Sequence, residues 1–245
     1  MKLALIAIVS CMALSVKSLN FAEKVAGAVP GADNYNPVST AFLPYYDIPD
    51  IPVMDVQSTD LICRSPDMTA AVTPFSIDAG NDIRIWFNDK KVSPYAGIPP
   101  VGPCSFWLAP VASNGVGKVW TKIHEYTNDG NEKTNWCSAK IVNNGGYYQF
   151  TIPSEITPGT YILRTELIDI LGASKTNYDD FTMGPRFHSN CLVVKITGKG
   201  TSPLKNPVSI MDVYKPYNKT PMLPTTMANS AFKLPGPPAY TTGKP

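Results

Sequence analysis

Charged residues are scarce in this chain of 245 residues: Asp, Glu, Lys and Arg together make up 16%, against about 25% in an average soluble protein. The formal net charge is +2. Lys2 and Lys17 account for it, because the remaining basic and acidic residues are equal in number. Proteins bind nucleic acids largely by neutralising phosphates with Lys and Arg. The lack of excess positive charge therefore argues against a nucleic-acid partner.

Long apolar runs and helical patterns are lacking as well. After the N-terminal stretch, no segment approaches the run of about eighteen apolar residues that a membrane-spanning helix needs. The chain has 24 prolines, about twice the usual share, and proline breaks a helix interior. A membrane span and a helical bundle are both disfavoured, whereas the 44% of hydrophobic residues can form a sizeable core.

The first eighteen residues have the pattern of a secretory signal peptide. Lys2 provides the positive charge, residues 3–14 form a short apolar segment, and small residues follow at suitable cleavage positions. We expect cleavage after Ser18, which makes Leu19 the first residue of the mature chain. The protein is therefore predicted to be secreted and extracellular.

The cysteine count agrees with secretion. One of the five cysteines lies in the predicted signal peptide, and the four that remain are Cys63, Cys104, Cys137 and Cys191. In an oxidising compartment they are expected to form two disulfides, for which three connectivities are possible. There is no Cys-x-x-Cys pair to suggest a zinc ribbon. Asn218-Lys219-Thr220 is a sequon for N-glycosylation.

Short alternating segments separated by turn clusters predict an all-β domain. The candidate strands are residues 83–87, 104–109, 119–123, 147–152, 161–169 and 191–197. This spacing is typical of an antiparallel β-sandwich of the immunoglobulin or fibronectin type III kind with long loops. We place this domain at residues 19–220, and we expect the Pro/Thr-rich residues 221–245 to form a flexible, protease-sensitive tail.

A series of short motifs follows in a fixed order along residues 50–215. They are Asp60-Leu61-Ile62-Cys63, Asp78-Ala79-Gly80, Trp107-Leu108-Ala109-Pro110, Trp120-Thr121-Lys122-Ile123, Thr151-Ile152-Pro153-Ser154, residues 184–191 and Tyr214-Lys215. In this order they resemble auxiliary activity family 9 (formerly glycoside hydrolase family 61), whose members are secreted fungal copper enzymes, the lytic polysaccharide monooxygenases. The resemblance implies the family's antiparallel sandwich and a disulfide between Cys63 and Cys191, which leaves Cys104 and Cys137 to pair.

The residues that hold copper in this family are replaced here. The resemblance implies a histidine brace, formed by an N-terminal histidine and a second imidazole, with a tyrosine in the axial position. The corresponding residues are Leu19, Pro100 and His188, and the two positions that support the site hold Thr165 and Arg186. An incomplete set of nitrogen ligands loses both the tetragonal geometry and the affinity for Cu(II). We therefore predict no copper cofactor and no catalytic residue.

Other catalytic arrangements find little support. The chain has two histidines, and His124 is expected to be a solvated residue at a strand end. His188 together with the mature amino terminus is an alternative, two-nitrogen copper site. Glu125 with Glu166 or Asp169 is a formal glycosidase pair, but nothing in the sequence brings two of these carboxylates together.

Two classes of function remain. The first is a noncatalytic secreted protein on the family's scaffold, acting at a cell wall, a polysaccharide or a host surface. Its candidate carbohydrate contacts are Tyr35, Tyr45, Tyr46, Tyr214 and Tyr217. The alternative is an active copper-dependent polysaccharide monooxygenase, acting on cellulose or a related glucan, with an atypical site.

Overall fold

The structure is a computed structural model, and it describes six segments of the chain: residues 22–44, 52–87, 102–128, 136–170, 184–218 and 232–240. The predicted signal peptide, Leu19, Tyr45, Tyr46 and Pro100 lie outside the described residues. Within the described segments, no helix is long and apolar enough to cross a membrane.

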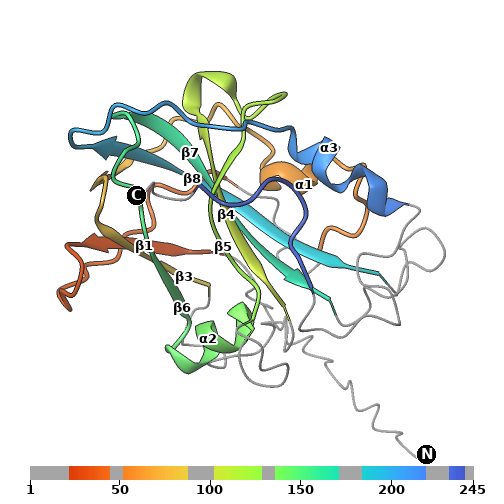
Figure 1. Ribbon diagram of the computed structural model, residues 1–245, viewed down its shortest axis with the longest axis horizontal. Helices are drawn as coiled ribbons and strands as arrows, with labels where there is room; N and C mark the ends of the chain where they lie inside the picture. The colour runs from red at the N-terminus through yellow and green to blue at the C-terminus, as the bar shows by residue number, and fades with distance from the viewer. Residues whose placement is uncertain are drawn as a thin grey trace, which may run out of the picture.

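Two sheets pack face to face (Figure 1). The smaller sheet has the strand order β1-β3-β6 and is antiparallel. Its strands are β1 (Lys24–Ala28), β3 (Asp82–Trp86) and β6 (Tyr147–Thr151). Its inward-facing residues alternate with outward-facing ones, as the sequence pattern predicts.

The larger sheet has the strand order β2-β8-β7-β4-β5. Its strands are β2 (Phe75–Asp78), β8 (Arg186–Thr197), β7 (Gly159–Asp169), β4 (Cys104–Pro110) and β5 (Thr121–Tyr126). All neighbouring strands are antiparallel except β2, which runs parallel to β8. A short turn after β2 leads directly into β3 of the other sheet, so these two strands cannot form a hairpin. The predicted all-β sandwich is confirmed, with this parallel pair as the departure from a purely antiparallel arrangement.

The larger sheet is buried on both of its faces. Its inner face packs on the smaller sheet through residues such as Phe106, Leu163 and Leu192. Its outer face is covered by short helical elements that sequence periodicity did not predict, because none exceeds seven residues. They are α1 (Asp60–Cys63), α3 (Ile210–Tyr214) and the 3₁₀ turns η1 (Val111–Ser113) and η2 (Lys215–Asn218). The remaining helix of the described segments, α2 (Cys137–Asn143), packs on β6 and contributes Cys137 and Ile141 to the inner core.

Both expected disulfides are present. Cys63 at the end of α1 is bonded to Cys191 on β8, with 5.2 Å between the Cα atoms. Cys104 at the start of β4 is bonded to Cys137 at the start of α2, with 5.7 Å between the Cα atoms. Each bond therefore fixes a short helix to a strand of the larger sheet.

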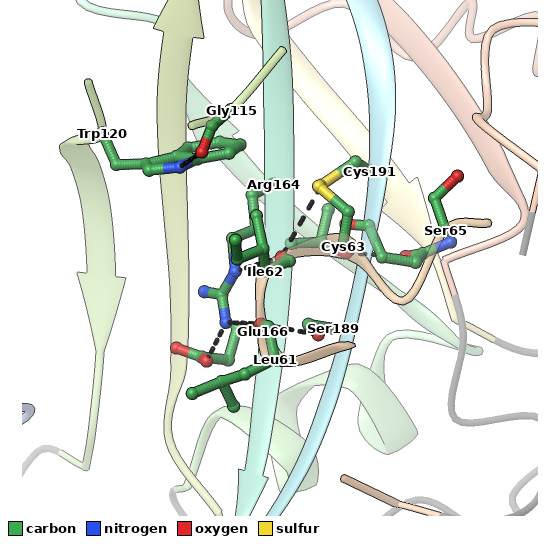
Figure 2. The surroundings of a disulfide bond; sticks show 12 residues. Leu61, Ile62, Cys63, Ser65, Gly115, Trp120, Arg164, Glu166, Ser189 and Cys191 are labelled. Carbon is green, nitrogen blue, oxygen red and sulfur yellow. Dashed lines mark hydrogen bonds and ion pairs between the residues drawn. A yellow bond between two sulfur atoms is a disulfide. The ribbon is translucent and has the colours of Figure 1, made fainter. Parts of the chain in front are cut away.

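A buried ion pair holds α1 on the outer face. Arg164 on β7 forms an ion pair with Glu166, and both side chains are fully buried. The Arg164 guanidinium also donates to the backbone oxygens of Leu61 and Ile62, at 2.8 and 2.6 Å, as Figure 2 shows beside the disulfide. The last carbonyls of a helix have no partner within the helix. Arg164 therefore supplies the hydrogen bonds that α1 cannot make for itself.

Tyr214 belongs to the same network. The prediction that it contacts a carbohydrate is therefore wrong. Its side chain is fully buried, and its hydroxyl donates to Glu166 Oε2 at 2.5 Å. Burial and the Glu166 carboxylate raise the pKa of Tyr214, so the hydroxyl stays protonated and remains a donor. The sequence placed this tyrosine in a surface segment, but α3 turns it into the core.

The expectation of a flexible C-terminal tail is wrong for residues 232–240. Phe232 is 5% exposed and packs edge-on against Trp136. The Tyr240 amide donates to the Lys122 carbonyl at 2.7 Å, and this segment crosses the larger sheet in Figure 1. Its prolines prevent a regular β-ladder, yet the segment is docked by backbone hydrogen bonds and by the packed side chains of Phe232, Leu234 and Tyr240. The rest of the predicted tail lies outside the described residues.

We expect Arg164→Met to lower the free energy of unfolding by about 3–5 kcal/mol, because Glu166 is left buried without its counter-charge. Urea unfolding followed by tryptophan fluorescence measures this. The double variant Arg164→Met/Glu166→Leu should recover part of the loss. Val116→Ala, at a position that is 70% exposed, is the control and should change stability by less than about 0.5 kcal/mol. A loss below about 1 kcal/mol for Arg164→Met would contradict the assigned role.

Candidate functional site

Three of the five positions implied by the family resemblance meet where β7 ends and β8 begins. Thr165 lies opposite Asn190, and Leu167 lies opposite His188. Residues opposite each other on paired strands point to the same face. Thr165, His188 and Arg186 therefore share the face of the larger sheet that is turned toward the smaller one. Leu19 and Pro100, the other two positions, lie outside the described residues.

Thr165 is engaged in a hydrogen-bonded chain that leads to the N-terminal segment. Its hydroxyl donates to Asn190 Oδ1 at 2.9 Å, and Asn190 Nδ2 donates to the Ala22 carbonyl at 2.8 Å. Thr165 and Asn190 are both almost fully buried. Asn190 thus fixes the chain just before β1 against this end of the sandwich. Sequence reasoning did not single it out, although it directly precedes Cys191 in a motif of the resemblance.

His188 is a buried neutral imidazole. The residue is 5% exposed, and within the described part of the chain its Nδ1 atom has no hydrogen-bond partner. Burial, then the positive charges of Arg64 and Arg186, lower the pKa of His188 to about 3. Its lone pair is therefore available at neutral pH, but the charges of Arg64 and Arg186 act on it.

Arg186 and Arg64 make this region unfavourable for a dication. Arg186 is 43% exposed at its side chain, and its Nη1 atom lies 3.6 Å from Asp169 Oδ2. Arg64 is buried and follows the disulfide-bonded Cys63. In the described residues, no group of three or more His, Cys, Asp or Glu side chains is arranged to hold a metal ion. Among the described residues, the side chains gathered here offer one imidazole, a threonine hydroxyl and an amide, and this partial set does not fit Cu(II), which prefers several nitrogen ligands.

His124 does not complete the site. It lies on β5, and both β4 and β7 separate it from β8. Three strand spacings amount to about 14 Å, too far for two ligands of one ion. Contrary to the expected solvated position, its ring stacks on Phe150, and its Nε2 atom lies 3.1 Å from the Tyr148 hydroxyl. Burial lowers the pKa of His124 to about 4.

The carboxylates considered for glycoside hydrolysis do not form a pair. Glu125 and Glu166 flank Ser105 on β4, which separates their strands by about 10 Å. Both oxygens of Glu166 are occupied, one by Arg164 and the other by Ser105 and Tyr214. Glu125 accepts a 2.6 Å hydrogen bond from Lys122. A general acid must lie within reach of the substrate, and the Glu166 side chain is fully buried with both oxygens engaged.

The remaining tyrosine candidates occupy different surroundings. Tyr35 is half-buried, and the Arg84 guanidinium lies 3.6 Å over its ring. Tyr217 is partly buried against the outer core, where burial raises its pKa. Asn218 of the sequon ends η2. The structure thus leaves two tyrosines, on separate parts of the described surface, as candidate carbohydrate contacts.

Comparison with known proteins points to the same family as the sequence motifs. The model of Auxiliary Activity family 9 (formerly GH61) matches residues 16–231. The chain is 29% identical over 196 residues to an AA9 family lytic polysaccharide monooxygenase A of Collariella virescens, covering 77% of this chain and 70% of that one. It is 28% identical over 189 residues to monooxygenase C of the same family from Aspergillus fumigatus, covering 76% of this chain and 51% of the relative. It therefore spans only about half the length of that second relative.

Solved structures share the fold. The structure of CvAA9A aligns with a TM-score of 0.73 at 24% identity, covering 90% of this chain and 97% of that chain. A cellulose-active polysaccharide monooxygenase from M. thermophila aligns with a TM-score of 0.65 at 22% identity, covering 89% and 97%. At these identities the likeness shows the sandwich alone.

Because His188 and His124 are buried, we expect the free energy of unfolding to decline in mild acid. Because their pKa values in the folded protein lie below the unfolded value of 6.5, the unfolded chain binds more protons below that pH. Stability is complete above about pH 6.5 and is lost progressively toward pH 4 and 3. His188 should account for about 2 kcal/mol of the loss between pH 7 and pH 5. Urea unfolding across this range should give a shallower pH dependence for His188→Gln, and an unchanged dependence would contradict the assignment.

Proposed function

Because the chain belongs to auxiliary activity family 9, we propose that it is a secreted, noncatalytic member that has lost the copper-binding histidine brace. Members of this family bind polysaccharides and are extracellular. In our proposal the protein keeps the scaffold and acts at a polysaccharide, a cell wall or a host surface. It does so without an oxidative reaction.

The observation that carries the proposal is the electrostatic setting of His188. At the position where the resemblance implies an axial copper ligand, a buried imidazole lies near two arginines. The neighbouring Thr165 side chain is committed to Asn190. A dication bound here would face guanidinium groups in a poorly solvated environment, where like charges repel strongly. Leu19 and Pro100, which supply no imidazole, are the second support for a lost brace.

Secretion is supported by the covalent structure. Two disulfides join α1 and α2 to the larger sheet, and disulfides persist mainly in oxidising compartments. The N-terminal signal pattern and the sequon at Asn218 point in the same direction. We propose that the mature chain begins at Leu19 and is glycosylated.

The alternative is an active copper-dependent polysaccharide monooxygenase with an atypical site. The similar proteins from Collariella virescens and Aspergillus fumigatus are named as monooxygenases, which favours this candidate. It requires that the mature amino terminus and His188 bind copper despite Arg186.

Copper binding separates the two candidates. For the secreted protein, after its N-terminus has been sequenced, we expect no Cu(II) site with a Kd below about 1 μM. We also expect no oxidised oligosaccharides from cellulose with a reductant. The reason is that Leu19 provides at most its α-amine and Pro100 provides nothing. Calorimetric titration and electron paramagnetic resonance measure the binding, with His188→Gln as the matched control. A submicromolar site with a tetragonal spectrum that is lost in His188→Gln would establish the alternative.

Polysaccharide binding tests the remaining part of the proposal. We expect the protein to be retained on an insoluble polysaccharide, with cellulose as the first probe, and the retention to be unchanged by a chelator. Aromatic rings supply much of the contact area at binding surfaces. Tyr35→Ala and Tyr217→Ala should therefore weaken retention, whereas Val116→Ala, at an exposed apolar position, should not. Retention that depends on copper would contradict a noncatalytic role.

A further inference from the structure

Residues 232–240, here called the C-terminal strap, lie along the edge strand β5 and outside the residues that the family model matches. β5 is the last strand in the order β2-β8-β7-β4-β5. Among the described strands it therefore pairs on one side only, with β4. The outer side of such a strand presents backbone groups that can pair with another chain.

The C-terminal strap and the loop that contains Val208 cover part of this edge. Trp120, just before β5, exchanges two backbone hydrogen bonds with Val208, at 3.0 and 2.9 Å. The Tyr240 amide then donates to the Lys122 carbonyl at 2.7 Å. Pro237 and Pro238 come shortly before Tyr240, and proline has no N–H to donate. The strap can therefore occupy the edge without itself becoming a template for a further strand.

Side chains anchor the strap to the outer face of the sheet. The Lys122 side chain is fully buried, and its Nζ atom donates to the Pro235 carbonyl at 2.8 Å and to Glu125 at 2.6 Å. Next to Pro235, Gly236 has a φ of +88°, and a Cβ atom there would lie 3.0 Å from Trp107. A glycine is thus required at the point where the strap crosses the tryptophan. The C-terminal strap is therefore packed specifically against the larger sheet.

We propose that the C-terminal strap guards the edge of β5, and that its release lets β5 pair antiparallel with β5 of a second copy of this chain. Pairing identical edges antiparallel satisfies a two-fold axis. With the axis between Ile123 and His124, Lys122 of each copy lies opposite Glu125 of the other. Both side chains lie on the outer face, as their mutual contact shows. The exposed edge is therefore complementary in charge to itself, and the strap competes with a second copy for Lys122.

The first test is a chain that ends at Ala231. Size-exclusion chromatography with light scattering should show a twofold increase in mass relative to the full chain, with an amount of dimer that depends on concentration. A synthetic peptide of residues 232–240 should restore the mass of the full chain. The same peptide with Tyr240→Pro, which lacks the amide that bonds to Lys122, is the matched control and should not. In the shortened chain, Glu125→Lys should prevent the dimer, because like charges then face each other across the axis.

A second variant decides the case in which the shortened chain fails to fold. Gly236→Val in the full chain places a branched side chain against Trp107 at a positive φ, so it should release the strap without removing it. We expect faster proteolysis within residues 232–245 and the same twofold increase in mass. Pro238→Ala, at an exposed position, is the control and should behave as the unmodified chain. A released strap with unchanged mass would overturn the proposal. So would a dimer that persists with the peptide or in the Glu125→Lys chain, because another surface would then form it.

Discussion

Arg164 lies in the middle of β7, and its guanidinium joins the larger sheet to the segment that carries α1. It neutralises Glu166 and donates hydrogen bonds to the carbonyl groups of Leu61 and Ile62, and its side chain is fully buried. A buried charge without such partners is strongly destabilising. The positions of α1, of the Cys63–Cys191 disulfide and of Tyr214 on α3 therefore depend on this one side chain.

The same strands position the candidate site on their opposite face. β7 and β8 pair over eleven residues, from Gly159 opposite Ile196 to Asp169 opposite Arg186. The register that places Arg164 opposite Cys191 therefore also places Thr165 opposite Asn190. Side chains alternate between the two faces of a strand. A scaffold can therefore keep its structural network on one face while its chemistry changes on the other. Arg186 near a buried, neutral His188 lies on this second face, where burial and the charges of Arg64 and Arg186 keep the imidazole unprotonated.

Covering the larger sheet is a recurrent requirement of this fold. Helical turns bury part of its outer face, and the C-terminal strap closes the rest beside β5. The outer face of the sheet must be covered because Trp107, Trp120 and Trp136 pack there and would otherwise be exposed to water. Removing this apolar area from water, at roughly 25 cal/mol for each Å², favours the docking of the C-terminal strap.

Local patterns in the sequence predicted the strands from β3 to β8, because alternation and turn residues are local properties. They did not single out β1 (Lys24–Ala28) or β2 (Phe75–Asp78), which are short and flanked by irregular segments of the sequence. The order of its motifs also determined the family, the sandwich and the pairing of Cys63 with Cys191, which left Cys104 to pair with Cys137. The replacement of the family's brace histidines by Leu19 and Pro100 stays a prediction from the resemblance, since both positions lie outside the described residues. Tertiary structure alone decided that Tyr214 is buried, that His124 packs in an aromatic cluster, and that residues 232–240 dock instead of forming a flexible tail. The reason is physical: whether a side chain or a carbonyl finds a partner depends on residues far away in the chain, as for Lys122 and Pro235, which are 113 positions apart.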